Sequence, residues 1–323
     1  MKKPKKDTPA CPYCNAHSTI RKGHRKSKKR LTQKYQCKNK ECRRYFTSQP
    51  KLQKHKTYPI NLILNTVSNI NLGYSLKQSQ SYFKGKKHNQ KTKIPRSTLS
   101  YWYNQLKTTL PYHRIRKKIT QNYKPIDIIK KKKFIHHNQP FLYQYHKPKI
   151  DLFLNSYPKL KHYLENIENI LPKDIFNNSQ RISQIAKIKN NNQNIQLKTK
   201  QNYATKLADI ALQITEDNKQ RHRIIESIML KNDTATIATE IPIYLKLKNN
   251  TITGHIDFLQ IRFHKLHILD FKPEKINKQE AITQLYLYAK ALSKTTNIPL
   301  KHFCCAFFDN KDYYEFCPIY YKN

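Results

Sequence analysis

Two aspartates and a lysine near the C-terminus are the side chains of this chain best suited to chemistry. Asp257 falls in a β-branched and aromatic run, residues 251–263. Asp270 and Lys272 close a second such run, residues 265–272. Both runs predict strands, and because side chains alternate along a strand, Asp270 and Lys272 leave the same face. Burying an unpaired carboxylate is costly unless a cation compensates it. The pattern therefore indicates a site for a hard divalent cation, with an ammonium beside the attacking water.

The order of these and neighbouring motifs resembles the PD-(D/E)xK nuclease superfamily, in particular its RecB-like branch. The pattern of that branch, GxxD, DxK and QxxxY, is matched by Gly254–Asp257, Asp270–Lys272 and Gln284–Tyr288. Several motifs in the right order are more specific than a DxK tripeptide alone. The resemblance covers the last third of the chain and implies a restriction-endonuclease-like α/β/α core with a mixed sheet over residues 201–323.

The resemblance also implies roles for single residues. The ligands that it implies for a catalytic Mg²⁺ or Mn²⁺ are His222, Asp257, Asp270 and the backbone carbonyl of Phe271. Lys272 would orient or polarise the attacking water. Gln284 and Tyr288, four apart on a predicted helix, would brace the site or contact the DNA backbone.

Two glutamates and a simpler interpretation stay open. His222 lies in a helical stretch, with Glu226 one turn further along the same face. Glu226 and Glu240 are lesser candidates, and Glu240 equally suits the capping of a sheet edge. Alternatively, Asp270 and Lys272 form an exposed pair at a strand end, and His222 is a surface residue of a basic helix.

The remaining elements expected in residues 201–323 are helices over 203–228 and 277–293 and strands over 238–247, 302–308 and 313–319. Cys304, Cys305 and Cys317 fall inside these strands. Iron–sulfur clusters use four cysteines in spaced runs, so these three are expected to be core thiols.

Four other cysteines form two short pairs near the N-terminus, Cys11 with Cys14 and Cys37 with Cys42. Two such pairs suit one tetrahedral Zn²⁺ ion that is coordinated by two turns, each of which carries one pair. Disulfides are the alternative, but no apolar run follows the basic start MKKPKK, so no secretion signal favours them. Residues 1–50 are therefore predicted to form a zinc ribbon, in which the metal supplies much of the folding energy.

The residues around these cysteines resemble the N-terminal zinc ribbon of insertion-element transposases. The shared features are the CPxC start, a basic turn with Gly23, the run from Gln33 to Cys37, and the aromatic-Phe-Thr ending at Thr47. The second pair is C-x4-C where C-x2-C is usual, which leaves the affinity for zinc less certain than the fold.

Residues 51–110 predict three helices. Residues 59–71 carry a helical apolar stripe that ends near Gly73, Ser75 suits the N-cap of a short second helix, and Pro95 opens a third. This order resembles the helix-turn-helix that follows the ribbon in the same transposases. It implies that Arg96, Ser97, Thr98, Ser100 and Tyr101 face DNA, while Leu99, Trp102 and Leu106 pack inward. A three-helix packing module without a DNA role is the alternative.

Residues 111–200 carry the least information and are predicted to be a basic helical and linker region. The run Lys130–Lys133 and the aromatic residues 140–146 suit a loop and strand that follow the DNA backbone. They equally suit a core strand with a solvated basic flank. Residues 190–196, rich in Asn, are expected to be a linker.

The charge of the chain predicts a polyanionic partner. Its formal net charge is +43 over 323 residues. The first 100 residues hold 26 Lys and Arg against two acidic residues, whereas residues 201–323 hold 17 against 13. The acidic groups thus concentrate where the cation site is expected, and affinity for nucleic acid concentrates before it. Part of the basic excess could reflect an AT-rich genome.

Together these patterns predict a multidomain, metal-dependent DNA nuclease, with structural zinc and catalytic Mg²⁺ or Mn²⁺. Origin in a mobile element is one possibility, and a homodimer is plausible because cutting two strands needs two sites. No run approaches the length of a membrane span, so a cytoplasmic, nucleoid-associated protein is expected. The alternatives are a transposase-like protein that uses the same domain for strand cleavage, and a non-enzymatic DNA-binding regulator with a vestigial nuclease fold.

Overall fold

The computed structural model describes residues 8–14, 16–27, 30–47, 58, 60–81, 94–107, 109–172, 174–188, 195–200, 202–212, 214, 218–248, 250–272 and 277–321. The chain divides into two compact units, Met1–Leu64 and Asn65–Asn323. Residues 84–93, between the second and third predicted helices, lie outside the described residues, as do residues 190–194 of the predicted linker.

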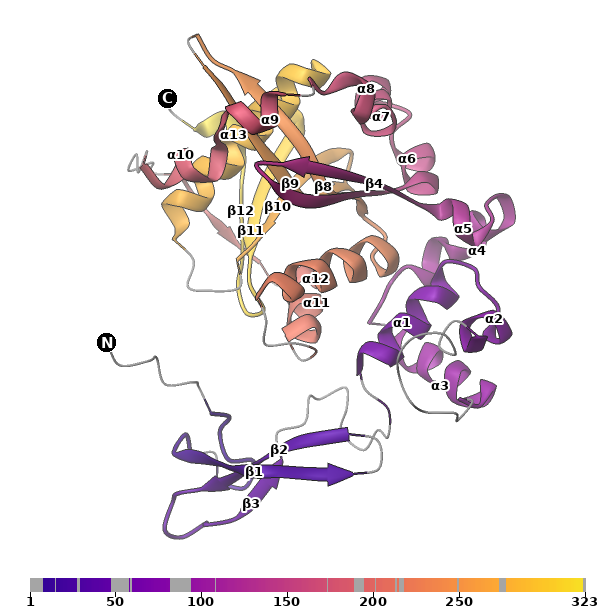
Figure 1. The fold of residues 1–323 in the computed structure, drawn as a ribbon, viewed down its shortest axis with the longest axis vertical. Coiled ribbons are helices and arrows are strands. Elements are labelled where there is room, and N and C mark those ends of the chain that lie inside the picture. Colours follow the sequence, from indigo (N-terminus) through magenta and orange to yellow (C-terminus); the bar gives the residue numbers. More distant parts are fainter. Residues whose placement is uncertain are drawn as a thin grey trace. The chain divides into compact units, whose positions relative to one another are not determined.

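The first unit holds a three-stranded antiparallel sheet in the order β1-β2-β3. Its strands are β1 (Thr19–Ser27), β2 (Arg30–Cys37) and β3 (Tyr45–Thr47) (Figure 1). The Tyr35 ring of β2 stacks on the Phe46 ring of β3, with 5.6 Å between centroids. The buried apolar cluster of this sheet contains these two rings and the cysteines Cys11 and Cys37. The predicted small β domain is confirmed, and its core is too small to stabilise it alone.

Three helices follow at the predicted places: α1 (Ile60–Asn71), α2 (Leu76–Ser81) and α3 (Arg96–Leu106). Gly73, just past α1, has φ +91°, the left-handed conformation expected of a helix stop. Ser75 caps α2, since its Oγ accepts a hydrogen bond from the Gln78 amide at 3.1 Å, and the Gln78 side chain accepts one from the Ser75 amide at 2.9 Å. This reciprocal pair is a capping box.

In the part of the second unit that the structure describes, nine strands form one sheet, in the order β4-β5-β8-β9-β10-β11-β12-β7 with β6 beside β9. They are β4 (Ile129–His136), β5 (Gln139–His146), β6 (Gln180–Arg181), β7 (Lys198–Thr199), β8 (Thr236–Lys246), β9 (Thr251–Arg262), β10 (Lys265–Phe271), β11 (Phe303–Phe308) and β12 (Tyr313–Phe316). The pairs β10–β11 and β6–β9 are parallel, and the other pairs are antiparallel. The predicted mixed sheet is therefore confirmed.

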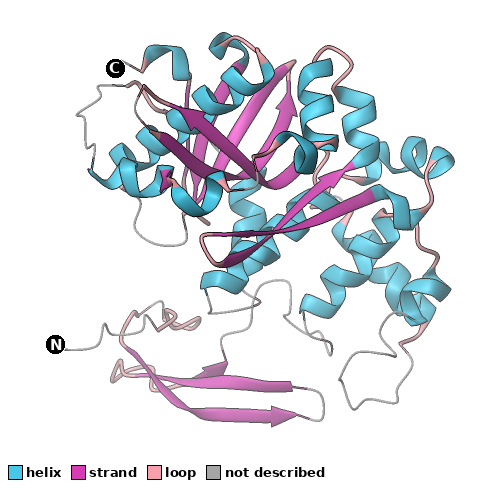
Figure 2. Ribbon diagram, turned by 45° about the horizontal axis from the view of Figure 1, so that its top comes forward, coloured by secondary structure: helices cyan, strands magenta, loops and turns pink. Residues whose placement is uncertain are grey.

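Helices lie on both faces of this sheet (Figure 2). The helices after α3 are α4 (His113–Asn122), α5 (Pro125–Ile128), α6 (Lys147–Phe153), α7 (Pro158–Glu165), α8 (Ile167–Ile170), α9 (Ile175–Asn178), α10 (Ile182–Ile188), α11 (Tyr203–Leu212), α12 (Asn218–Asn232) and α13 (Lys278–Thr296), with short 3-10 turns at Leu300–His302 and Pro318–Tyr320. Cys305 of β11 points its thiol at the Leu285 carbonyl of α13. Phe271 of β10, on the other face, meets His222 of α12. Thus α12 and α13 approach the end of β10 from opposite faces.

Two features of the second unit differ from the prediction. The helix expected over residues 203–228 is two helices, α11 and α12. Residues 111–200 were expected to be a separate region, yet strands β4 and β5 lie in the same sheet as β8. Tyr143 and Tyr145 of β5 are buried in the main core, so this hairpin needs the sheet to cover its apolar side. The wider division into four regions stays a prediction.

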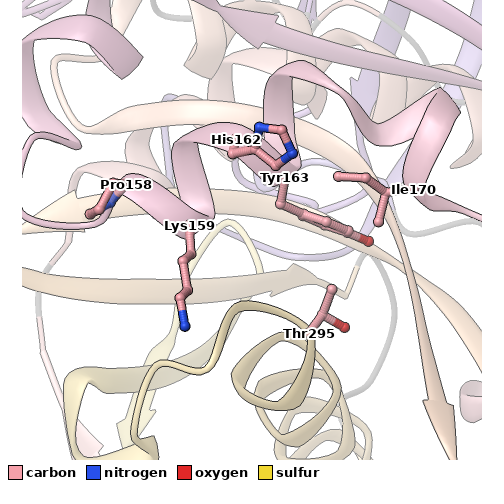
Figure 3. Close-up of a pocket in the computed structure, with 6 residues that line it drawn as sticks. All are labelled: Pro158, Lys159, His162, Tyr163, Ile170 and Thr295. Carbon is pink, nitrogen blue, oxygen red and sulfur yellow. The ribbon is translucent and has the colours of Figure 1, made fainter.

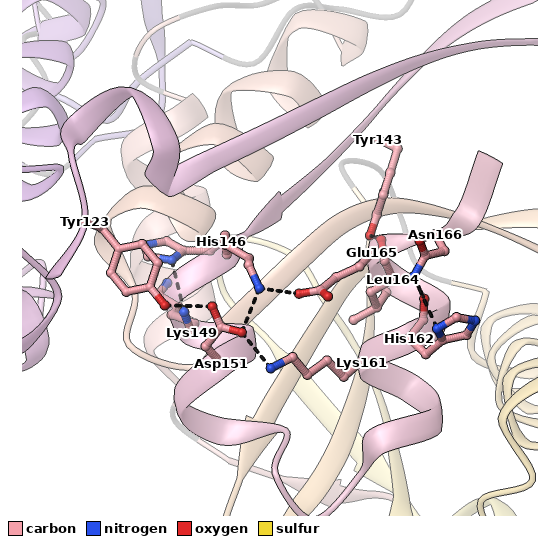
Figure 4. Close-up of polar contacts among 11 residues, drawn as sticks. Tyr123, Tyr143, His146, Lys149, Asp151, Lys161, His162, Leu164, Glu165 and Asn166 are labelled. Carbon is pink, nitrogen blue, oxygen red and sulfur yellow. Dashed lines mark hydrogen bonds and ion pairs between the residues drawn. The ribbon is translucent and has the colours of Figure 1, made fainter. Parts of the chain in front are cut away.

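A small ionic network joins helix α6 to helix α7 and to Tyr123 at the end of α4 (Figure 4). Asp151 of α6 accepts hydrogen bonds from Lys147 at 2.8 Å and from the Tyr123 hydroxyl at 2.7 Å, and pairs with Lys161 of α7 at 2.7 Å. Lys147 also reaches Glu165 at 2.7 Å. These groups are partly exposed, so each pair is expected to add little free energy.

Lys149 of α6 is a fully buried ammonium that joins two elements far apart in sequence. Its Nζ donates to the carbonyls of Leu230, at 2.9 Å, and of Asp233, at the end of α12, and to the carbonyl of Thr236, at 2.9 Å, where β8 begins. The last carbonyls of a helix carry partial negative charge and lack partners within the helix. Lys149 thereby fixes the end of the helix that carries His222.

Replacing Lys149 by Met is expected to lower the free energy of unfolding by roughly 3 kcal/mol or more, because three buried carbonyls lose their donor. Chemical denaturation followed by circular dichroism would measure it. Lys161→Met is the matched control: this partly exposed lysine makes a surface pair, and its loss should cost less than about 1 kcal/mol. Equal losses from the two variants would contradict a bracing role for Lys149.

Candidate active site

A cleft of about 1170 Å³ in the second unit collects most of the acidic residues predicted to do chemistry. Helix α12, strands β8–β10, helix α13 and the hairpin β4–β5 all contribute to its lining. Four carboxylates line it: Glu226, Glu240, Asp257 and Asp270. A smaller hollow of about 500 Å³, lined by Pro158, Lys159, His162, Tyr163, Ile170 and Thr295, has no acidic side chain in its lining and offers no such chemistry (Figure 3).

Asp270, near the end of β10, lies at the centre of a continuous polar chain. Lys272 Nζ is 2.7 Å from Asp270 Oδ2 and donates to Gln284 Oε1 at 2.9 Å. Gln284 Nε2 in turn reaches Asp270 Oδ1 at 3.4 Å and the Tyr288 hydroxyl at 2.9 Å. Helix α13 presents Gln284 and Tyr288 one turn apart, so the residues of the QxxxY motif hold those of the DxK motif in place.

Asp257 on β9 lies beside this group. Its Oδ2 accepts a hydrogen bond at 2.9 Å from the amide of Phe271, the residue after Asp270. The strand register also sets Glu240 of β8 opposite Asp257, because its neighbours Thr239 and Ile241 pair with Phe258 and Ile256. Glu240 has φ +53°, a left-handed conformation that is strained for such a residue.

Helix α12 brings His222 and Glu226 to the same cleft. His222 Nδ1 lies 3.7 Å from Asp257 Oδ2, and its ring meets the Phe271 ring edge-on, with 5.0 Å between centroids. Glu226 is 3% exposed, and its buried Oε1 has no hydrogen-bond partner among the described residues. A buried carboxylate oxygen without a partner is costly. Glu226, a lesser candidate in the sequence, is therefore a strong candidate for a cation ligand.

The electrostatics of the cleft are those of carboxylates crowded away from water. Burial, followed by the charge of Asp270, raises the pKa of Asp257 well above its ordinary range. Burial also raises the pKa of Glu240 to about 7, and burial with the neighbouring Glu240 charge raises that of Glu226. Burial lowers the pKa of Lys272, but the neighbouring carboxylates, Asp270 first among them, together raise it above its ordinary value. The carboxylates of the cleft thus repel one another, and a cation between them would relieve the repulsion.

Gly254, the glycine of the GxxD motif, is required by its contact with the Tyr288 ring. A Cβ at position 254 would lie 2.6 Å from Tyr288 Cε1 and 3.4 Å from Ile182 Cδ1. The missing side chain therefore lets α13 come close enough to β9 for Gln284 to reach Asp270.

Gly254→Ala is expected to cost about 1–3 kcal/mol of stability, because the buried ring must move. Thermal unfolding would measure this loss. Adding Tyr288→Leu to that variant frees the space, so the double variant should lose less than the sum of the two single losses. Strictly additive losses would show that the contact does not determine the need for glycine.

The four N-terminal cysteines form a second candidate site, in the first unit. Their sulfurs all lie within 4.8 Å of one another, with 3.7 Å between Cys11 and Cys42 and 3.6 Å between Cys14 and Cys37. Sulfurs around a tetrahedral Zn²⁺ with bonds of about 2.3 Å are about 3.8 Å apart. In these turns the Cys11 amide donates to the Ala16 carbonyl at 2.9 Å, and the Cys37 amide donates to the Arg44 carbonyl at 3.0 Å. The cluster therefore fits zinc in spite of its longer second loop.

The residues expected to face DNA lie on α3, away from the cleft lining. Arg96, Ser97 and Tyr101 are exposed, whereas Thr98 and Ser100 are half-buried. The residues expected to pack inward, Leu99, Trp102 and Leu106, are buried. The inward face of this helix is as predicted. That the other five residues face DNA stays a prediction.

The sequence did not reveal that the hairpin β4–β5 lines the cleft. Lys131 and Lys133 of β4 lie in the cleft lining, as do Pro140, Phe141 and Leu142 of β5. His255 of β9 holds the hairpin: its ring stacks on Phe141, with 3.8 Å between centroids, and its Nε2 is 2.8 Å from His136 Nδ1. The basic run Lys130–Lys133 is visible in the sequence. Its position at the cleft depends on the pairing of β5 with β8, which the run itself does not predict.

No protein-family model, no curated protein and no solved structure matches this chain. Among the described helices, none combines the length and the apolar character that crossing a membrane requires.

Proposed function

We propose that the second unit is a metal-dependent nuclease that hydrolyses phosphodiester bonds in DNA. The observation that carries the proposal is the convergence of Asp257, Asp270 and Lys272 in one cleft, bridged by the Phe271 amide and the Gln284 side chain. The motifs on which the resemblance to PD-(D/E)xK nucleases rests are thus the same residues that contact one another.

The residues present fit a hard divalent cation. Mg²⁺ is usually held by one or two carboxylates and keeps several waters, so it needs no tight cage of protein ligands. Among the described His, Cys, Asp and Glu side chains, no three in the cleft bring their ligand atoms within 4.8 Å of one another. Asp257 and Asp270 would hold the ion, with His222 and the orphaned Glu226 oxygen beside them. The ion would supply positive charge and a water of lowered pKa.

The protein groups around this position have separate tasks. The Phe271 amide fixes Asp257 Oδ2, and Gln284 holds both Lys272 and Asp270. Lys272 places an ammonium where negative charge develops on the phosphate, which stabilises the transition state. Tyr288 braces Gln284 from one turn further along α13.

The walls of the cleft favour a nucleic-acid substrate. Besides Lys272, five basic side chains line it: Lys131, Lys133, Arg181, Arg223 and Lys231. Such groups suit contacts to phosphates, and binding through them weakens steeply as salt concentration rises. The N-terminal ribbon and the exposed face of α3 would add affinity for a duplex and choose its sequence.

The test is cleavage of supercoiled plasmid by the full chain. Nicked or linear product is expected with Mg²⁺ or Mn²⁺ and none in buffer freed of both ions. Omission of the ions is preferable to a chelator, because a chelator would also take zinc from the cysteine cluster. Salt-sensitive retention of the plasmid without cleavage in any metal would overturn the proposal and favour a non-enzymatic DNA-binding regulator.

A further inference from the structure

A group of three potential metal ligands lies in the second unit outside the cleft. The ligand atoms of His267, Cys304 and Glu315 all lie within 4.8 Å of one another. None of the three is among the residues that line the cleft. The mechanism proposed above uses none of them.

Strand pairing brings these residues to one face of the sheet. His267 of β10 pairs with Cys304 of β11, and Glu315 of β12 pairs with Ala306, which lies two residues after Cys304. Paired residues, and residues two apart on one strand, point to the same face. The neighbouring Cys305 faces α13, so the cluster lies on the opposite face from that helix.

One buried polar atom of the cluster, on His267, lacks a hydrogen-bond partner among the described residues, whereas the Cys304 thiol lies 3.7 Å from the Phe316 carbonyl. His267 is 7% exposed, and its buried Nδ1 has no hydrogen-bond partner among the described residues. That nitrogen lies 3.9 Å from Glu315 Oε2, too far for a hydrogen bond. Buried polar atoms of native proteins normally have a partner, so an orphaned imidazole nitrogen aimed at a carboxylate and a thiol calls for a ligand.

Glu315 is already oriented for such a ligand. Lys200 Nζ is 2.8 Å from Glu315 Oε1, and the Tyr313 hydroxyl donates to Oε2 at 3.3 Å. Ligating carboxylates are commonly held in this way by outer groups. Lys200 also offsets one of the two negative charges that a carboxylate and a thiolate would bring.

We propose that His267, Cys304 and Glu315 form a second metal site, which takes Zn²⁺ with a water in the fourth position. One imidazole nitrogen, one sulfur and one carboxylate oxygen suit this borderline-soft ion, whereas Mg²⁺ prefers oxygen ligands only. Binding forms Zn–N, Zn–S and Zn–O bonds and releases the Cys304 thiol proton to solvent. The site joins three strands, so its role is to stabilise that side of the sheet.

The experiment compares the zinc content of the full chain with that of variants, by mass spectrometry of the purified proteins. Cys304→Ser and His267→Gln should each contain about one zinc ion per chain fewer than the unchanged protein. Cys305→Ala, a change of the adjacent cysteine on the other face, should lose none. The difference between proteins is the readout, so the result does not depend on how much zinc the N-terminal cluster holds.

A second measurement covers variants that fold poorly. Co²⁺ added to the chain with Cys11, Cys14, Cys37 and Cys42 replaced by Ser, in which the second unit is expected to stay folded, should give visible ligand-field bands and a thiolate charge-transfer band. Further replacement of Cys304 by Ser should abolish the charge-transfer band. Two outcomes would each overturn the proposal. One is an equal zinc content in the unchanged protein and in folded Cys304→Ser, and the other is the absence of a charge-transfer band in the variant without the N-terminal cysteines.

Discussion

Asp270→Asn is expected to lower the rate of metal-dependent DNA cleavage by about a thousandfold or more, which corresponds to roughly 4 kcal/mol of transition-state free energy. Asp270 is buried, lies 2.7 Å from Lys272 Nζ and accepts from Gln284. Asn keeps the shape but removes the charge that would bind the cation and balance the ammonium. Single-turnover cleavage of a labelled duplex at saturating Mg²⁺ would measure the loss.

The control for this variant is Asp127→Asn. Asp127 is a half-exposed carboxylate that pairs with Lys130 at 2.9 Å and does not line the cleft, so its change should leave the rate within about twofold. Retention of DNA at low salt should be similar in all three proteins, because the basic groups are unchanged. Unaltered cleavage by a correctly folded Asp270→Asn protein would remove the cleft from the mechanism, even if the chain still cut DNA.

Cys37→Ser is expected to unfold the N-terminal unit. Among the described residues, the buried apolar cluster of its sheet contains only cysteines besides Tyr35 and Phe46. Binding of a structural zinc contributes about 10–16 kcal/mol at neutral pH, far more than so small a core can supply. The variant should lose about one zinc ion per chain, become open to proteolysis before residue 60 and retain DNA less well.

The second unit provides the comparison for this result. Cys37→Ser should leave the unfolding temperature of the second unit unchanged. Lys149→Met should lower that temperature and leave the N-terminal unit folded. Cys305→Ala should keep both the zinc content and the protease resistance of the N-terminal unit. Full zinc content and unchanged protease resistance in Cys37→Ser would show that Cys37 is not a ligand of the zinc ion that stabilises this unit.

Local patterns in the sequence determined the elements and the order of the motifs. The two cysteine pairs, the glycine stop at Gly73, the capping box at Ser75 and the alternation along β9 and β10 all depend on neighbours within a few residues. For the same reason the sequence predicted that Asp270 and Lys272 would lie together, two residues apart on one strand.

Tertiary structure alone decided which distant segments meet. The hairpin lines the cleft because Tyr145 pairs with Ala238 and His255 stacks on Phe141, contacts that join segments about a hundred residues apart. Gly254 is needed because α13 returns to place Tyr288 on it. His267, Cys304 and Glu315 meet only through the register of three strands. Local propensity specifies whether a segment forms a helix or a strand, but the free energy of burying its apolar face selects the segment that it packs against. A short stretch of sequence does not contain both of these segments.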